Sequence, residues 1–243
     1  MIPGAVSVGY IHPGVWSATF GESMLDLFFY DATHNARFTS HPFGKMSKEC
    51  GSGGIVAGRN KLAELMLTGE AEWLWMVDTD MSFAPDTVER LVESADPIER
   101  PIVGGLCFAH KTDGKASFHG TRYRAQPTLY DFLDEPDRVG FAPRFTYEPD
   151  ALEPVAGTGA ACLLIHRSVF EDVRAKYGAV WFDPIVHPTG PTTFSEDLSF
   201  CVRAAGCGHS AWVHTGVKTS HHKGGVYLDE QFYIAQRAAN EGG

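Results

Sequence analysis

WLWMVDTDMSF, residues Trp73 to Phe83, places five apolar positions directly before two aspartates, Asp78 and Asp80, that flank a single threonine. A short apolar run rich in aromatic and aliphatic side chains is typical of a buried strand. Two carboxylates at the end of such a strand need a counterion, a ligand or water, because burial penalises a charge. The stretch therefore predicts a core strand that ends at a polar site.

Strand and helix signals alternate on both sides of this junction. The first half predicts strands at 5–11, 36–40, 73–77 and 101–108, and helices at 16–27, 55–69 and 84–95. The second half predicts strands at 127–133 and 161–166, and helices at 167–178, at 195–206 and from about 228 onward. Strands separated by helices predict an α/β protein with a largely parallel sheet covered by helices on both faces.

Composition limits the class of protein. The chain has 243 residues, an apolar fraction of 44% and a formal net charge of −10, enough for one large domain or two small ones. The acidic balance argues weakly against a nucleic-acid binder. No basic leader precedes the first apolar run and no apolar stretch approaches the length of a membrane span, so we expect a cytoplasmic protein.

The five cysteines of the chain show no C-x-x-C pair, and we expect them to be reduced and structural.

The two aspartates follow a strand at the edge where open α/β sheets bind ligands. Carboxylate oxygens in this arrangement are typical ligands of Mg²⁺ or Mn²⁺, with the remaining positions left for water or phosphate oxygens. The alternative is that Asp78 closes the strand and Asp80 caps a turn. In AWVHTGVKTSHHKGG, one imidazole from His214, His221 or His222 would complete an oxygen-rich metal site.

The helix at 195–206 begins with two further carboxylates, Glu196 and Asp197. Thr193 and Glu196 fit a capping box, which gives Glu196 a structural role. Asp197 has no partner of this kind. A helix N-terminus is expected to lower the pKa of Asp197 and keep it ionised, either as a dipole-stabilising residue or as an acceptor for a substrate proton.

One segment departs from the acidic balance of the chain. From His110 to Arg124 the sequence HKTDGKASFHGTRYR carries Lys111, Lys115, Arg122 and Arg124 against one acidic residue, a local net charge of +3. We favour a solvated loop over a phosphate-facing patch for this stretch.

Six segments occur in an order that resembles the GT-A type glycosyltransferases, particularly glycosyltransferase family 2. They are VSVGYI at 6–11, AGRNKLAEL at 57–65, WMVDTD at 75–80, VAGTGAACLLIHRSVF at 155–170, SEDLSFCVRAAG at 195–206 and VHTGVKTSHH at 213–222. The resemblance implies one Rossmann-like GT-A domain over 1–243, with a mixed, mostly parallel central sheet flanked by helices. Residues 1–109 would form the nucleotide-sugar-binding half, and residues 110–243 the acceptor-binding and catalytic half.

The resemblance also implies a donor site and a metal site. Asp80, and less directly Asp78, would hold Mn²⁺ or Mg²⁺ against the diphosphate of a nucleotide-sugar, with His221 as a further ligand and His222 as its alternative. Among donors we expect a uridine diphosphate sugar. The residues implied to contact the donor are Val8, Tyr10, His12, Arg59, Asn60, Asp78, Thr79, Asp80, Gly157 and Gly159.

By the same resemblance Glu196 and Asp197 form the catalytic pair, with Asp197 as the base that deprotonates the acceptor hydroxyl and inversion at the anomeric carbon as the outcome. The acceptor is open. If the basic residues at 111, 115, 122 and 124 face the cleft, a polyanion such as DNA with hydroxymethylated bases is expected. Otherwise we expect a saccharide, a lipid-linked acceptor or a small alcohol. The long Gly-rich loop at 41–54 also departs from the family pattern.

Three other readings remain. A nucleotidyltransferase acting on sugar phosphates also uses a parallel sheet and two aspartates, but the segment after the first strand, HPGVWSATF, lacks the lysine or arginine of a phosphate-binding loop. A zinc hydrolase would need helical histidine pairings that are absent from the sequence. A binding module could keep the fold without the chemistry. No Walker or dinucleotide-binding glycine motif occurs in the required context.

Overall fold

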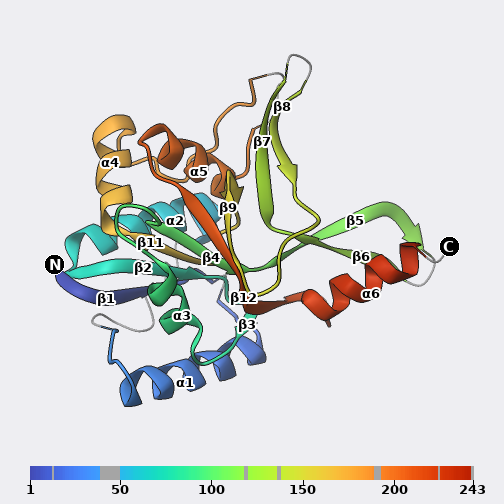
Figure 1. Cartoon of the computed structure of the whole chain (residues 1–243), viewed down its shortest axis with the longest axis horizontal. Helices are drawn as coiled ribbons and strands as arrows, with labels where there is room; N and C mark the ends of the chain where they lie inside the picture. The colour runs from blue at the N-terminus through green and yellow to red at the C-terminus, as the bar shows by residue number, and fades with distance from the viewer. Residues whose placement is uncertain are drawn as a thin grey trace.

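The computed structural model describes residues 1–12, 14–38, 50–117, 120–135, 138–188, 193–223 and 225–241. Helices and strands alternate through the first half, and strands dominate the middle of the chain (Figure 1). The helices are α1 (Ala18–Thr33), α2 (Cys50–Thr68), α3 (Thr87–Ser94), α4 (Arg167–Tyr177), α5 (Glu196–Gly206) and α6 (Glu230–Glu241). The strands are β1 (Ile2–Gly9), β2 (Ala71–Val77), β3 (Met81–Phe83), β4 (Ile102–Leu106), β5 (Phe108–Ser117), β6 (Gly120–Pro127), β7 (Leu129–Glu135), β8 (Arg138–Pro143), β9 (Leu152–Val155), β10 (Gly157–Thr158), β11 (Cys162–His166), β12 (Ala211–Lys223) and β13 (Val226–Leu228).

The central sheet has eight strands in the order β1-β2-β11-β4-β12-β13, with β3 and β9 also paired to β12. Among the described strands, β1 pairs in parallel with β2 and β4 with β12. β11 enters between β2 and β4 and is antiparallel to both. The large mixed sheet is thus confirmed. The expectation that it is mostly parallel is wrong, because most of its strand pairs are antiparallel. The sequence gives no sign of where β11 inserts, since its apolar run fits either direction.

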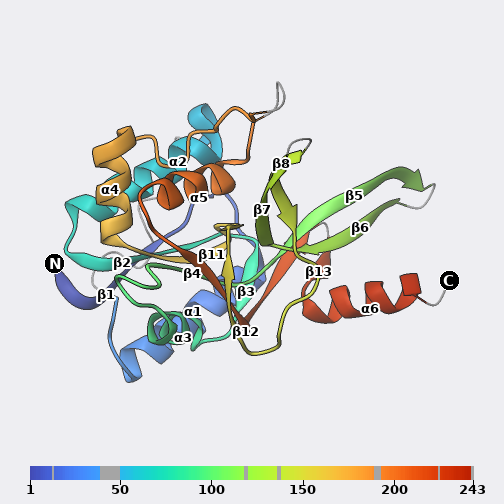
Figure 2. The same cartoon turned by 45° about the horizontal axis from the view of Figure 1, so that its top comes forward.

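Helices cover both faces of this sheet (Figures 1 and 2). Alternate residues of β2 divide between the two sides, as the period of a strand requires. Leu74 and Met76 pack with α2, α4 and α5 in one buried cluster. Trp73, Trp75 and Val77 pack with α1 and α3 in the other. The opening stretch of sequence therefore forms the centre of the core, as predicted.

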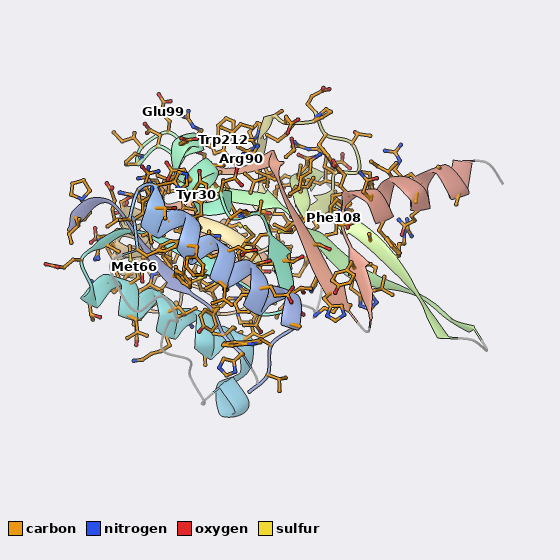
Figure 3. All side chains as sticks on the ribbon, turned by 90° about the horizontal axis from the view of Figure 1, so that it is seen from below. Tyr30, Met66, Arg90, Glu99, Phe108 and Trp212 are labelled. Carbon is orange, nitrogen blue, oxygen red and sulfur yellow. The ribbon has the colours of Figure 1, made fainter. Side chains whose placement is uncertain are left out.

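The described residues of the basic stretch, 110–117 and 120–124, do not form a loop. They lie in β5 and β6, which form an antiparallel ribbon that projects from the body beside α6 (Figure 1). Phe108, at the start of β5, marks the base of the ribbon (Figure 3). Gln236 of α6 fastens β6 by a hydrogen bond from its Nε2 to the carbonyl of Ala125, 3.1 Å long. The sequence signal is weak because the stretch is polar and lacks the alternating apolar positions of a half-buried strand.

Two shorter expectations change in the structure. The strand expected at 36–40 is reduced to a single bridge between Val6 and Phe38, and residues 39–49 lie outside the described part of the chain. The end of the Gly-rich loop at 41–54 belongs to α2, which is broken at Gly54. Gly54 has a φ of 66°, a conformation that glycine adopts without strain.

The four cysteines whose side chains are described, Cys107, Cys162, Cys201 and Cys207, are free thiols, as expected. No helix in the described ranges is both long enough and apolar enough to cross a membrane.

The core gives a direct test of packing. Phe200 of α5 is fully buried and stacks on Phe182 with the ring centroids 4.7 Å apart. We expect Phe200→Ala to lower the free energy of unfolding by about 3–5 kcal/mol, through lost burial and the cavity left behind. The control is Phe29→Ala on α1, a site that is 73% exposed, where the change should stay within about 0.5 kcal/mol. Urea denaturation of both variants measures the difference, and equal effects would contradict this account of the core.

Candidate functional site

The acidic turn after β2 borders a cavity. The backbone N–H of Asp78 donates to the carbonyl of Ala161 at 3.1 Å, and the N–H of Met81 donates to the carbonyl of Asp78 at 3.2 Å. The first bond ties the end of β2 to the segment before β11, and the second closes a tight turn that presents Asp78, Thr79 and Asp80 at the end of the strand. The cavity has a volume of about 300 Å³, within the usual range for small-molecule sites. Its lining residues are Ile11, His12, Gly54, Ile55, Asp78, Thr79, Asp80 and Lys223.

Arg59 of α2 joins this turn to the start of α5. Its side chain is buried, and its Nη2 lies 3.3 Å from Oδ1 of Asp78 and 3.4 Å from Oδ1 of Asp197. Its Nε lies 3.7 Å from Oε1 of Glu196, and its Nη1 donates to the carbonyl of Ala160 at 3.1 Å. We expected Arg59 to reach the donor. Instead its guanidinium is committed to three carboxylates of the protein and does not line the cavity.

Asp197 is held in a poorly solvated position. Burial, with smaller contributions from the charges of Glu196 and Asp78, raises its pKa to about 6 against the opposing effect of Arg59. Its Oδ1 is buried without a hydrogen bond, although the side chain as a whole keeps 21% exposure. The expectation that the helix N-terminus lowers this pKa is therefore wrong, because desolvation outweighs the dipole. A carboxyl group that titrates near neutral pH is suited to accept a proton.

Glu196 has a different role from the one its spacing indicates. The N-cap of α5 is Ser195, whose Oγ accepts a hydrogen bond from the N–H of Leu198 at 3.4 Å. Glu196 is therefore the first residue of the helix, and the capping box with Thr193 does not form. Ser195 takes the cap because the helix begins two residues later than the box requires. This leaves the Glu196 carboxylate available to Arg59.

On the other side of the turn, Asp80 is paired with two residues of β12. Oδ1 of Asp80 lies 3.3 Å from Nε2 of His221, and its Oδ2 contacts the ammonium group of Lys223. The strand is fixed here by the N–H of His222, which donates to the carbonyl of Asp80 at 2.7 Å. Burial alone would raise the pKa of Asp80, but the hydrogen bonds from His221 and Lys223 lower it to about 2. Asp80 therefore stays ionised at neutral pH.

Of the three candidate histidines, His221 is the one placed at the acidic turn. The ring of His222 stacks on Tyr227 with centroids 4.8 Å apart. The Nδ1 of His214 accepts a hydrogen bond from the N–H of Gly216 at 3.1 Å, in the part of β12 that pairs with β9. The side chains of His214 and His222 are thus both engaged elsewhere.

The His221–Asp80 pair fits a divalent cation. Nδ1 of His221 lies 3.0 Å from the carbonyl oxygen of Phe108 and must carry a proton to bond it. Nε2 of the same ring faces Oδ1 of Asp80 at 3.3 Å, so a divalent cation that displaced the Nε2 proton would meet a nitrogen lone pair and a carboxylate oxygen together. A metal-bound histidine characteristically donates its other N–H to a carbonyl in this way.

No group of three histidine, cysteine, aspartate or glutamate side chains suited to a metal gathers in the described ranges. Asp80 and His221 alone would therefore need ligand and water oxygens to complete a Mg²⁺ or Mn²⁺ site.

The expected donor residues divide between the cavity and the packing around it. His12 and Thr79 line the cavity. Tyr10 is buried among His12, Trp16 and Phe20, so its ring supports the wall from behind. Val8, next to it on β1, is also buried in the core.

The remaining three expected donor residues lie around α5 and α2. The side chain of Asn60 accepts a hydrogen bond from the backbone N–H of Phe182 at 2.9 Å and donates one to the Asp183 carboxylate at 2.6 Å. Asn60 does not line the cavity. Gly157 is packed against Phe141 and Leu198, where a Cβ atom would come within 2.7 Å of the Phe141 ring. Gly159 faces Asp197, with the position of an added Cβ 3.6 Å from Oδ2.

The expected acceptor residues lie on the ribbon. Lys111 of β5 is directly opposite Arg124 of β6, and both side chains are exposed. Lys115 and Arg122 belong to the same two strands, but their side chains lie outside the described part of the structure. The base of the ribbon adjoins the site, because the Phe108 carbonyl at the start of β5 accepts the His221 bond.

Sequence reasoning missed Lys223, Ile11 and Ile55. Lys223 had a signal, since it directly follows the two histidines in SHHK. Ile11 and Ile55 read as ordinary core positions, and nothing in the sequence separates them from the rest of the apolar residues.

No protein-family model matches the chain, and no curated protein matches it. Solved structures that resemble it include A197 from STIV, which is 12% identical, with a TM-score of 0.51 over 93% of this chain and 91% of that one. At this level of identity the likeness shows that the two proteins share an α/β fold, and carries nothing about activity.

The charges around Arg59 give a pH-dependent test. Removing the guanidinium in Arg59→Gln leaves Asp78, Glu196 and Asp197 without their shared cation, and it removes the one charge that holds the pKa of Asp197 down in the folded state. A raised carboxylate pKa favours folding at low pH, and that contribution is lost as the pH increases. We therefore expect a loss of about 3–5 kcal/mol in unfolding free energy at pH 8, and a clearly smaller loss at pH 5.

Lys61→Gln on the same helix is the control, since its pair with Glu64 is exposed on both sides. It should change the unfolding free energy by less than about 1 kcal/mol at either pH. Urea denaturation at the two pH values measures both variants. An Arg59→Gln loss that is equal at pH 5 and pH 8 would contradict the carboxylate cluster.

Proposed function

We propose that the protein is a glycosyltransferase that moves a sugar from a nucleoside diphosphate sugar to an acceptor hydroxyl, with Asp197 as the base. The observation that carries the proposal is the position of Asp197. This carboxyl group has a pKa of about 6, and the buried guanidinium of Arg59 joins it to Asp78, which lines the ligand-sized cavity. A proton acceptor is thus linked through one side chain to a cavity in which a bound cation or Lys223 could offset the charge of a diphosphate.

The donor is proposed to occupy the cavity beside Asp78, Thr79 and Asp80. When bound by Asp80 and His221, Mn²⁺ or Mg²⁺ would supply electrostatic stabilisation of the departing diphosphate. Asp80 suits this task because it stays ionised, and the hydrogen bond to the Phe108 carbonyl keeps Nε2 of His221 directed at Asp80. His12 borders the same cavity and is placed to contact the nucleotide. A uridine diphosphate sugar is the first donor to test.

On the acceptor side, the Asp197 carboxylate would take the proton of the attacking hydroxyl as the new bond to the sugar forms. Attack from the face opposite the departing diphosphate inverts the anomeric carbon. Arg59 holds the Asp197 carboxylate in place. Glu196 contributes by keeping the guanidinium of Arg59 between Asp78 and Asp197. Burial of Asp197 makes it more basic, since its ionised form is poorly solvated.

The fold is proposed to be of the GT-A type. The mixed sheet with helices on both faces, the acidic turn directly after β2, and the Glu196–Asp197 pair at the start of α5 support this assignment. The division into a donor half and an acceptor half stays a prediction.

The acceptor is to be identified by testing a panel of candidate compounds. The exposed Lys111 and Arg124 on the ribbon favour including DNA with hydroxymethylated bases, since phosphate backbones are bound by such side chains. Saccharides and small alcohols complete the panel.

Reaction products distinguish the proposal from the nucleotidyltransferase alternative. Incubation with nucleotide-sugars and acceptors should release free nucleoside diphosphate, whereas a nucleotidyltransferase would release pyrophosphate from nucleoside triphosphates. We also expect a nucleoside diphosphate with Mn²⁺ to raise the melting temperature, because a ligand that binds only the folded state stabilises it. Pyrophosphate release would overturn the proposal, and nucleotide binding without any turnover would favour a binding module.

Asp197→Asn tests the base. We expect turnover to fall by about 100-fold or more, the usual contribution of a general base, while nucleoside diphosphate affinity stays within a few-fold of the wild type. The wild-type rate should rise with pH through about 6, as Asp197 loses its proton. Asp172→Asn is the control, because Asp172 is an exposed carboxylate of α4 paired with His209. An unchanged rate in Asp197→Asn would remove this residue from the mechanism.

A further inference from the structure

We propose that Lys223 is a transferable counterion, which neutralises Asp80 in the free protein and binds the diphosphate of the donor when a divalent cation occupies Asp80. The inference rests on the proposed function and assigns a role to a residue that the sequence motifs do not include. It predicts that Lys223 opposes metal binding and supports nucleotide binding, so its removal should change the two affinities in opposite directions.

The first step is the arrangement around Asp80. His221 and Lys223 approach different oxygens of the same carboxylate, Oδ1 and Oδ2 respectively. His221 is held by its bond to the Phe108 carbonyl. The side chain of Lys223 is 39% exposed, and its contact with Asp80 is its one ion pair among the described residues. The imidazole is thus fixed, whereas the ammonium group sits on a flexible stem that is free to move within the cavity.

The second step is the charge of the cavity. Its lining contains two carboxylates, Asp78 and Asp80, and Lys223 is the one lysine or arginine among the lining residues in the described part of the chain. Arg59 is buried behind Asp78 and committed to carboxylates. A diphosphate entering this cavity therefore meets net negative charge unless Lys223 or a bound cation offsets it. Lysine serves as a compact point charge in phosphate sites.

The third step is competition. Lys223 and a divalent cation both gain from the negative charge of Asp80, so each weakens the attraction of the other to this carboxylate. Once Asp80 is neutralised by the divalent ion, the ammonium group gains more from the oxygens of a bound diphosphate. Lys223 can make this change while its backbone stays paired with Val226 of β13. The same lysine would then stabilise the charge that develops on the leaving diphosphate.

The experiment uses Lys223→Met, which keeps the length of the side chain and removes its charge. Binding of Mn²⁺ to the nucleotide-free protein is followed by the electron paramagnetic resonance signal of the free ion. Binding of uridine diphosphate and other nucleoside diphosphates is followed by calorimetry at saturating Mn²⁺. We expect Lys223→Met to tighten Mn²⁺ binding by about two- to five-fold, the range for a partly exposed ion pair. Nucleoside diphosphate affinity should fall by about ten-fold or more, as for a lost charged hydrogen bond.

Two variants serve as controls. Lys223→Arg keeps the charge and should leave the Mn²⁺ affinity within about two-fold of the wild type, because the competition with the ion persists. Lys218→Met removes a comparable lysine of the same strand, which pairs with Glu230 at 2.6 Å and is 50% exposed. Since Lys218 lies outside the cavity lining, its removal should leave both affinities unchanged.

The outcomes separate this inference from the proposed function. If the wild type binds no nucleoside diphosphate with or without Mn²⁺, the proposed function fails, and the inference fails with it. If the wild type binds a nucleoside diphosphate, the proposed function keeps its support, and Lys223→Met decides the inference alone. Opposite changes in the two affinities support it. Weaker Mn²⁺ binding, or nucleotide binding that stays at the wild-type level, overturns it.

Discussion

The buried guanidinium of Arg59 is the interaction on which the site depends. It lies between the end of β2 and the start of α5, which are far apart in the chain, and it contacts Asp78, Glu196 and Asp197 at once. Three carboxylates in a poorly solvated space would repel one another without a shared cation. With it they are held at fixed positions, at the expense of leaving Nε of Arg59 and Oδ1 of Asp197 without hydrogen bonds. Unpaired buried polar atoms of this kind are unfavourable, and they concentrate where a protein performs chemistry.

Two aspartates of this site differ in their protonation because their surroundings differ. Asp80 has a pKa near 2, since two donors offset its burial, whereas Asp197 has a pKa near 6, since burial and neighbouring carboxylates outweigh one guanidinium. The first is therefore always available to a cation, and the second exchanges a proton near neutral pH. Separation of pKa values between carboxyl groups is how enzymes divide electrostatic and acid–base roles among identical side chains. The same residue type thus serves two purposes on the two sides of Arg59.

Sequence periodicity predicted β2, β4, β11 and most helices, because each has a regular apolar pattern. It did not predict that β11 lies antiparallel between β2 and β4, since an apolar run carries no direction, and it missed the β5–β6 ribbon, which has no such pattern. For the site, the resemblance of the motifs to a known family implied that Asp80 and His221 lie together, and their side chains are 3.3 Å apart, whereas the residue pattern alone left three histidines open. The partners of Arg59 and the packing roles of Tyr10 and Asn60 depend on contacts across the chain, and spacing along the sequence contains no information about them.

The geometry of β12 explains why the acidic turn after β2 and the base of the basic ribbon lie so close together. This strand pairs with β4 in the core and with β3 and β13 at its far end, where it delivers His221 and Lys223 to Asp80. The tautomer of His221 is set by the carbonyl of Phe108, which is also the first residue of the basic ribbon. A shift at the base of the ribbon would lengthen this hydrogen bond and leave the imidazole ring less firmly oriented. Nε2 of His221 would then face Asp80 less precisely, so the placement of the ribbon and the geometry of the His221–Asp80 pair are physically linked.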